Sequence, residues 1–294
     1  MRSILSFLGV AFALIGFQAF AIDESVEPGV RHVHFAAKPA ALRLRSGSVL
    51  VLAQDTGLPL FAKNVDQIMP IASITKLMTA MVVLDAGLPL LESIDIDRSD
   101  VDRRKGSRSK LKVGTSLMRA EMLKLALMAS ENRAAAALAR NFPGGTEAFV
   151  AAMNQKAVEI GMVNTHFEDP TGLTPDNVST AEDLAKMVAA AHGYPLIREY
   201  TTSDSFKIES EDRRRHRLLS YVNSNRLVKN RQWDIGLSKT GYISEAGRCL
   251  VMQAMIADRP VIIVLLDSWG KLSRTADANR IKRWIEADLL RISG

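Results

Sequence analysis

The sequence predicts an α/β protein of the α+β kind, with one antiparallel sheet built from both ends of the chain and packed with helices. Strand-like patterns occur over residues 48–64 and again over 233–268, whereas residues 118–191 are mostly helical in pattern. Because the strands come first and last, one sheet must gather the N- and C-terminal segments, with a helical subdomain between them. The 294 residues are 47% hydrophobic, which is enough for a sizeable core.

The first 21 residues have the layout of a secretory signal peptide. Met1 and Arg2 precede an apolar run over residues 4–17, and small residues flank Phe20, which predicts cleavage after Ala21. A transmembrane anchor is the alternative, but the run is short for a membrane-spanning helix. We therefore expect a periplasmic protein, with residues 1–21 removed and no stable membrane anchor.

Residues 22–45 contain prolines and little periodicity, which predicts a linker before a single domain over residues 46–291. The one cysteine, Cys249, excludes an internal disulfide and is expected to be an inert buried thiol. The net charge of +6 comes with no nucleic-acid-binding motif, and no HExxH sequence indicates a zinc peptidase. We expect no metal, no cofactor and no nucleic-acid partner.

Turn signals and periodicity place the individual elements. A hairpin is expected around Gly57, and a buried helix is expected after Ala72, where apolar residues recur at helical spacing. Residues 93–114 are polar and are expected to form a loop. The later elements are expected to be helices over 118–128, 132–140 and 146–161, a helix capped by Ser179 and Glu182 that ends near Ala191, strands over 233–243 and 249–268 with a turn at 257–260, and a helix over 275–290.

A serine three residues before a lysine marks the start of the first buried helix. This SxxK spacing occurs four times, but only Ser73 and Lys76 begin an apolar helix, where the spacing brings Cβ atoms to about 5–6 Å. Ser73 is either a nucleophile with Lys76 as its base, or a helix cap followed by a surface charge. Burial and the helix dipole both lower the pKa of a lysine at this position, which favours the catalytic interpretation.

Two further motifs supply partners for this pair. Ser130-Glu131-Asn132 is the one SxN sequence in the chain and lies between two expected helices. Lys239-Thr240-Gly241 is the one KTG sequence and lies on an expected strand. SxxK, SxN and KTG in this order are the motifs of serine penicillin-binding proteins and β-lactamases.

These motifs stand in the segments PIASITKLMTAMVVLDAGLPL, LALMASENRAAAALAR, FEDPTGL and LSKTGYISEAGRCLVM. Over about residues 46–291 the chain resembles the low-molecular-mass penicillin-binding proteins, which are serine D-alanyl-D-alanine peptidases of bacterial cell walls. Within them it looks most like the D-alanyl-D-alanine endopeptidases of the penicillin-binding protein 7 type. The resemblance implies a β-lactamase/transpeptidase-like fold, peptidoglycan peptide stems as substrates and β-lactam antibiotics as covalent inhibitors.

The resemblance also implies the catalytic roles. Ser73 is the nucleophile that attacks a D-alanyl carbonyl, and Lys76 is the general base that takes its proton. Ser130 relays that proton to the leaving amine. Asn132 holds the substrate amide and fixes Lys76. Glu131 departs from the commonest wording of the SxN motif, but the chemistry uses the outer two side chains.

A second group of residues is implied in substrate binding. Lys239 and Thr240 bind a substrate carboxylate, and Gly241 lets the substrate backbone approach the strand. The backbone amides of Ser73 and Tyr242 form the oxyanion hole. Arg274, near the start of the last helix, is a further candidate for binding a carboxylate.

Other residues receive a structural interpretation. The family-like stretch over residues 169–172 is expected to be a structural turn. The tryptophans Trp233, Trp269 and Trp284 are expected in the core, where such residues are more common than as sugar-stacking platforms.

Three alternative functions remain open. A β-lactamase shares the three motifs, but class A enzymes deacylate with a glutamate that has asparagine four residues later, and no such pair exists here. A D-alanyl-D-alanine carboxypeptidase removes a terminal D-Ala; many carry a further C-terminal domain and an amphipathic anchor, neither of which is expected here. A non-catalytic wall-binding protein would not need the motif residues together.

Overall fold

The computed structural model describes residues 42–212 and 215–292. The chain divides into two units, Met1–His34 and Phe35–Gly294, and all the described residues belong to the second. The expected signal peptide and nearly all of the expected linker lie outside the described residues. No helix within the described ranges is long and apolar enough to cross a membrane.

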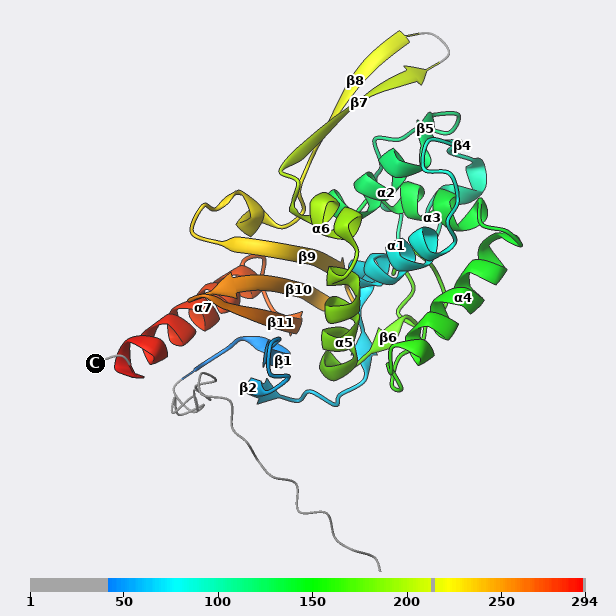
Figure 1. The fold of residues 1–294 in the computed structure, drawn as a ribbon. Helices are drawn as coiled ribbons and strands as arrows, with labels where there is room; N and C mark the ends of the chain where they lie inside the picture. Colours follow the sequence, from blue (N-terminus) through cyan, green and yellow to red (C-terminus); the bar gives the residue numbers. More distant parts are fainter. Residues whose placement is uncertain (1–41, 213–214, 293–294) are drawn as a thin grey trace, which may run out of the picture. The chain divides into compact units, whose positions relative to one another are not determined.

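A five-stranded antiparallel sheet forms the centre of the second unit, in the order β2-β1-β11-β10-β9 (Figure 1). β1 (Ser46–Ala53) pairs with β2 (Pro59–Lys63) on one side and with β11 (Arg259–Ser268) on the other. β10 (Gly247–Ile256) and β9 (Asp234–Ile243) continue the sheet beyond β11. Strands from both ends of the domain are therefore neighbours, which confirms the predicted sheet.

Helices cover both faces of this sheet. α5 (Ala181–His192) packs against β1, β10 and β11 on one face, in the core that contains Val264. α7 (Ser273–Ile292) packs on the same strands from the other face, where Leu265 lies in a separate core with Ile281. Because successive side chains of a strand point to opposite faces, covering both faces requires the continuous apolar runs that this sequence has in its last third.

The helices between the strands form the expected helical subdomain. α1 (Lys76–Asp85) runs through its centre, with eight of its ten residues buried, and packs against the five α-helices α2 to α6. The helices around it and the short strand pairs that border them are α2 (Arg119–Met128), α3 (Asn132–Arg140), α4 (Gly145–Glu159), α6 (Pro195–Thr202), β3 (Met69–Pro70) with β6 (Val178–Ser179), and β4 (Ser93–Asp95) with β5 (Ser116–Met118). α6 contacts both α2 and β9, so it joins the subdomain to the edge of the sheet.

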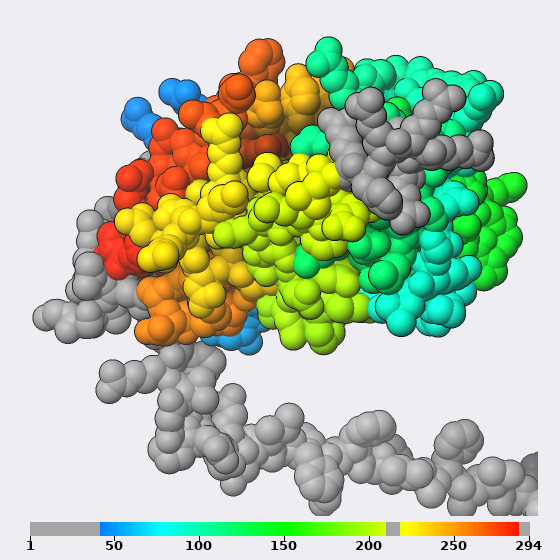
Figure 2. Space-filling model, turned by 90° about the horizontal axis from the view of Figure 1, so that it is seen from above, coloured from blue at the N-terminus to red at the C-terminus, as the bar shows by residue number. Residues whose placement is uncertain are grey.

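The segment between α6 and β9 forms elements that the sequence pattern did not indicate. It contains the hairpin of β7 (Ser205–Asp212) and β8 (Arg215–Val222), followed by the 3-10 helix η4 (Arg226–Lys229). In the space-filling view this segment, in yellow, lies between the C-terminal elements in orange and red and the helices in green and cyan (Figure 2). In the described residues, β7 and β8 pair with each other alone.

Two local expectations are wrong. Ser179 does not cap α5, because it lies in β6, and the adjacent Thr180 occupies the cap position with its Oγ1 accepting a 3.2 Å hydrogen bond from the Asp183 amide. Trp269 is not a core residue, because it follows the end of β11 in a loop and is 81% exposed.

A buried carboxylate joins the two ends of the domain. Asp277 on α7 has no exposed surface, and its Oδ2 accepts hydrogen bonds from the amides of Arg45 and Ser46 at 2.9 and 2.8 Å and from the Ser46 hydroxyl at 2.8 Å. The Ser46 hydroxyl also lies 2.7 Å from that of Ser268. Arg280 pairs with the other carboxylate oxygen at 2.7 Å. Asp277 therefore fastens α7 to β1 and β11.

We expect the substitution Asp277→Ala to lower the free energy of unfolding by about 2–4 kcal/mol, because a buried amide, a partly buried amide and a buried hydroxyl lose their acceptor. Urea denaturation measures this loss. Asp234→Ala removes an exposed carboxylate from β9 and should change stability by less than about 0.5 kcal/mol. Equal losses in the two variants would contradict the role given to Asp277.

Candidate active site

Ser73 lies at the junction between the sheet and the helical subdomain. It belongs to η2 (Ala72–Thr75), a single 3-10 turn that leads directly into α1 and contacts β9 and β10. Ala72 has a φ of 49°, in the left-handed region that an L-residue adopts only when its surroundings hold it there. No side-chain cap hydrogen bond forms at the start of η2 or of α1, so Ser73 is not a helix cap.

The Lys76 amine makes three hydrogen bonds inside the protein. Its Nζ donates to the Ser73 hydroxyl at 2.8 Å, to Oδ1 of Asn132 at 2.7 Å and to the carbonyl oxygen of Thr171 at 2.6 Å. These acceptors come from three separate segments of the chain. The structure thus brings together the predicted nucleophile, base and SxN asparagine.

Burial controls the charge of this amine. The Lys76 side chain is fully buried, and the loss of solvation lowers its pKa from 10.5 to about 7, although the charges of Asp169 and Glu131 act in the raising direction. At neutral pH a large share of the Lys76 amines is therefore unprotonated and able to accept the serine proton.

A second buried lysine holds the second serine. Lys239 on β9 is 1% exposed and donates to the Ser130 hydroxyl at 2.8 Å and to its neighbour Thr240's carbonyl at 2.9 Å. Burial, with the nearby charges of Lys76 and Arg274, lowers the Lys239 pKa well below its ordinary value. Ser130 turns the chain between α2 and α3 with a φ of 61°, and this conformation points its hydroxyl into the site.

The strand β9 lies directly against the nucleophile turn. The absence of a side chain at Gly241 permits this, because a Cβ there would come within 3.0 Å of the Ala72 Cβ and 3.1 Å of the Ser73 amide nitrogen. The hydroxyl of the preceding Thr240 donates a 2.8 Å hydrogen bond to the hydroxyl of Ser224. Gly241 therefore has a second function, in packing, beside the one that the sequence suggested.

Tyr242 and Arg274 lie beyond Gly241. Tyr242 is 56% exposed, and the guanidinium of Arg248 lies 4.4 Å from the centre of its ring. Arg274 donates from Nη1 to the carbonyl oxygens of Gly241 at 2.7 Å and Cys249 at 2.9 Å, which ties the first turn of α7 to β9 and β10. Cys249 is fully buried, and burial raises its thiol pKa to about 11, so it is the inert thiol that was expected.

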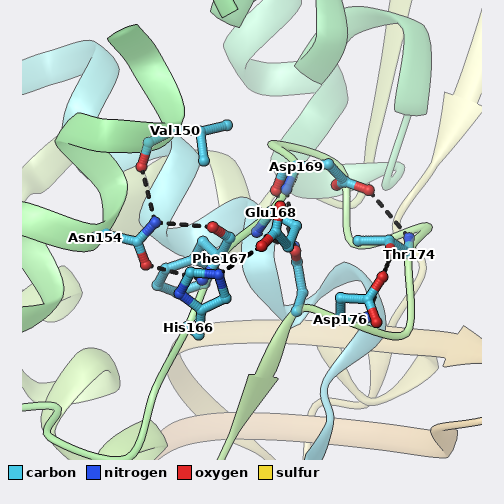
Figure 3. Close-up of polar contacts among 9 residues, drawn as sticks. Val150, Asn154, His166, Phe167, Glu168, Asp169, Thr174 and Asp176 are labelled. Carbon is cyan, nitrogen blue, oxygen red and sulfur yellow. Dashed lines mark hydrogen bonds and ion pairs between the residues drawn. The ribbon is translucent and has the colours of Figure 1, made fainter. Parts of the chain in front are cut away.

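The loop that begins at Asp169 forms another wall of the site, because the Thr171 carbonyl accepts a hydrogen bond from Lys76. Figure 3 shows polar contacts that hold this loop and the chain before it. Asn154 of α4 fixes the chain before it, donating to the Phe167 carbonyl at 2.8 Å and accepting from the Phe167 amide at 2.9 Å. The Asp169 carboxylate then accepts hydrogen bonds from the amides of Thr171 and Gly172, both at 2.6 Å, and from the Thr174 amide at 3.0 Å. This folded loop presents the Thr171 carbonyl to the buried amine.

The sequence favoured a structural turn for this family-like loop, and its direct contact with the Lys76 amine was not predicted. Thr171 supplies an acceptor to Lys76 through its backbone, and a backbone carbonyl has no sequence signal. Gly172 has a φ of 77°, and a Cβ there would lie 2.0 Å from the Ala72 carbonyl oxygen. The glycine of the PTG sequence was the detectable signal for a close approach between two backbones.

Ser107 and Ser109 support the SxN motif, and the sequence did not predict that they belong to the site. The hydroxyl of Ser107 accepts a 3.0 Å hydrogen bond from Nδ2 of Asn132, which orients that amide so that its oxygen faces Lys76. Glu131 is buried, and the loss of solvation raises its pKa, while a hydrogen bond from Ser109 acts in the opposite direction. Ser107 and Ser109 belong to two further SxxK copies, and here they support the site.

The site offers the groups for covalent acyl transfer by a serine. The Ser73 hydroxyl is hydrogen-bonded to a buried amine of lowered pKa, and the Ser130 hydroxyl is hydrogen-bonded to a second buried lysine. A hollow of about 540 Å³ lies beside Asn132 and Thr171, but Ser73, Lys76, Ser130 and Lys239 do not line it, so it adjoins the nucleophile without containing it. In the described part of the chain, no three or more His, Cys, Asp or Glu side chains are grouped so that they could hold a metal ion.

Comparisons with known proteins agree with this chemistry. The family model for D-alanyl-D-alanine carboxypeptidase matches residues 34–270. A D-alanyl-D-alanine endopeptidase of Pseudomonas aeruginosa is 49% identical over 251 residues, which cover 85% of this chain and 80% of that protein. A D-alanyl-D-alanine endopeptidase of Escherichia coli is 46% identical over 244 residues, covering 83% and 78%. The D-alanyl-D-alanine carboxypeptidase DacF of Bacillus subtilis is 32% identical over 290 residues, covering 96% and 70%.

Solved structures show the same fold. The DD-transpeptidase of Streptomyces K15 superposes with a TM-score of 0.78 at 27% identity, covering 83% of this chain and 98% of that one. A putative penicillin-binding protein homologue from Mycobacterium tuberculosis superposes with a TM-score of 0.75 at 27% identity, covering 83% and 92%. These likenesses confirm the predicted transpeptidase-like architecture. The chain belongs to the D-alanyl-D-alanine carboxypeptidase family of serine peptidases.

Proposed function

We propose that the protein is a periplasmic D-alanyl-D-alanine endopeptidase, which hydrolyses D-alanyl cross-links in peptidoglycan through an acyl-enzyme on Ser73. The observation that carries the proposal is the fully buried Lys76 amine, with a pKa near 7, 2.8 Å from the Ser73 hydroxyl. Endopeptidase activity is favoured over carboxypeptidase activity because the relatives named endopeptidases are 49% and 46% identical, against 32% for the Bacillus carboxypeptidase.

Acylation begins with proton transfer from the Ser73 hydroxyl to the unprotonated Lys76 amine while Oγ attacks the D-alanyl carbonyl carbon. The backbone amides of Ser73 and Tyr242 stabilise the oxyanion that forms. Ser130 then relays the proton from Lys76 to the leaving amine as the C–N bond breaks, which leaves Lys76 unprotonated again, and Lys239 holds the Ser130 hydroxyl in place. Water hydrolyses the ester in the second half-reaction: Lys76 removes a proton from that water and passes it to the Ser73 oxygen as the ester bond breaks.

Substrate binding uses the exposed side of β9. Thr240, Lys239 and Arg274 supply positive charge and a hydroxyl for the carboxylate on the leaving side of the scissile bond. Arg274 is held for this purpose by the carbonyls of Gly241 and Cys249. A β-lactam presents a carboxylate and a strained amide in the same arrangement, so it acylates Ser73 and is released slowly.

D-alanyl-D-alanine carboxypeptidase activity is the second candidate. The description of the matching family model favours it, and so does the likeness to the Bacillus enzyme. Both reactions use the same acylation chemistry and differ only in the leaving group, which is one D-Ala in the first case and a whole peptide stem in the second.

Covalent labelling tests the nucleophile. Residues 22–294 should bind fluorescent penicillin stoichiometrically, and Ser73→Ala should abolish labelling because, among the described residues, the hydroxyl that the Lys76 amine contacts is that of Ser73. Gel fluorescence and the mass of the intact protein measure the adduct. Ser203→Ala, which alters a hydroxyl at the end of α6, is the control and should label normally. Persistent labelling of Ser73→Ala would refute the assignment.

The pH dependence of acylation tests the base. Lys76 must be unprotonated to act, so the acylation rate should rise with pH up to an inflection near 7 and level off above it. The Glu131 carboxylate raises the Lys76 pKa, so Glu131→Gln should move the inflection to lower pH. Stopped-flow acylation by a chromogenic cephalosporin measures both profiles. An inflection that moves upward, or a rate independent of pH from 5 to 9, would argue against Lys76 as base.

Digestion of cross-linked muropeptides separates the two candidate activities. Mass spectrometry should show dimers converted to monomers, with one water added at each cleaved D-alanyl bond. Loss of terminal D-Ala from monomers, with dimers left intact, would instead establish the carboxypeptidase.

A further inference from the structure

A small pocket next to Thr240 carries more positive charge than one carboxylate requires. It has a volume of about 200 Å³, and its lining includes Thr240 and four cations, Arg226, Arg248, Lys271 and Arg274. Among the described residues no aspartate or glutamate lines it. We call this depression the cationic pocket. In the proposed function, Thr240 and Arg274 bind the substrate carboxylate beside the scissile bond. The other three cations have no role in that contact.

These three cations come from different parts of the chain. Arg226 begins η4, Arg248 lies on β10, and Lys271 lies in the loop between β11 and α7. Arg226 and Lys271 are exposed, and neither has a carboxylate partner in the described structure. Like charges that converge without a counter-ion repel one another, and an anion in their midst removes that cost.

Arg248 forms the inner wall of the cationic pocket and is fixed there. Its guanidinium stacks on the Tyr242 ring at 4.4 Å, and its residue pairs with Tyr242 across β9 and β10. Burial and, after it, the neighbouring charge of Arg248 lower the pKa of Arg274, as expected for two guanidiniums close together without an anion between them. The pocket is therefore arranged before any ligand arrives, which favours binding of an anion.

The leaving group of the proposed reaction decides which anion fits. The leaving group of a carboxypeptidase is one D-Ala, with one carboxylate, and Thr240 and Arg274 provide for that group. The leaving half of a cross-link is itself a peptide stem, which keeps the carboxylate beside the scissile bond and also its own C-terminal carboxylate. A cross-link thus brings at least one more negative charge to the leaving side than a terminal D-Ala does.

We infer that Arg226, Arg248 and Lys271 bind a second carboxylate on the leaving peptide stem, and that the cationic pocket thereby selects cross-linked substrates over single stems. The inference rests on the proposed function and names the residues behind its specificity. Arg226 and Lys271 are positioned at the exposed rim to attract and hold the stem, while Arg248 serves as the fixed wall.

The test compares a two-carboxylate leaving group with a one-carboxylate ligand on the same enzyme. In the Arg226→Gln/Lys271→Gln variant, kcat/KM for a purified cross-linked muropeptide dimer should fall about tenfold or more, chiefly through KM. Acylation by fluorescent penicillin, which carries one carboxylate, should stay within about twofold of the unmodified protein, because Thr240 and Arg274 are intact. Lys229→Gln, an exposed lysine on the same 3-10 helix outside the cationic pocket, is the matched control and should leave both rates unchanged.

A modified substrate allows the enzyme variant and the loss of the substrate carboxylate to be compared separately and together. A dimer whose leaving stem ends in a carboxamide should be cut about tenfold more slowly by the unmodified protein, and the double variant should no longer distinguish it from the ordinary dimer. If dimer cleavage falls only in step with penicillin acylation, or if both proteins still distinguish the two dimers equally, the inference is overturned while the endopeptidase assignment stands. If the unmodified protein reacts with penicillin but cuts no dimer, the proposed function fails and the inference fails with it.

Discussion

The burial of the Lys76 amine is the constraint on which the rest of the site depends. An amine without water needs acceptors for its hydrogens, and here they are the Ser73 hydroxyl, the Asn132 amide oxygen and the Thr171 carbonyl. None of the three acceptors carries a full charge, so they give the protonated amine little electrostatic stabilisation. Burial therefore lowers the pKa of Lys76 to about 7. A carboxylate in direct contact would have kept the amine charged and unable to act as a base.

Bringing those acceptors to one point forces several backbones into close contact. Gly241 allows β9 to touch the nucleophile turn, and Gly172 allows the Asp169 loop to do so from the other side. Ala72 and Ser130 adopt left-handed conformations that their own side chains disfavour. The surrounding cores of α1 and of the two-sided sheet hold these residues in place, so packing energy far from the chemistry maintains the geometry of the hydroxyls.

Features with a periodic pattern or a specific side chain could be predicted from the sequence. Contacts that the backbone makes could not. The terminal sheet and α1 follow from the period of the apolar residues, because burial imposes it, whereas the three motifs were identified through their resemblance to a known family. The Thr171 carbonyl could not be predicted, since every residue has one. The hairpin of β7 and β8 has no second sheet partner in the described chain, so few of its positions need to be apolar and its period is weak. At the start of α5, both Ser179 and Thr180 are residue types that can cap a helix. Ser179 pairs with Met69 of β3, so Thr180 occupies the cap position.

Catalysis and specificity place different demands on the residues of this fold. Lys76 joins Ser73 and Asn132 through hydrogen bonds, and Lys239 joins Ser130 in a second pair. In the network of these five residues each side chain is fixed by the requirements of the proposed acyl transfer and cannot also adapt to the leaving group. Residues that choose between a single D-Ala and a peptide stem must lie outside this network but next to Thr240. Arg226 and Lys271 meet both conditions, since they line the same pocket as Thr240 and neither takes part in the hydrogen bonds given above for Lys76 and Lys239. Because both side chains are exposed, each contact with a substrate carboxylate is weak by itself. Several such charges together can favour a long leaving group over a short one without altering the chemistry of acyl transfer.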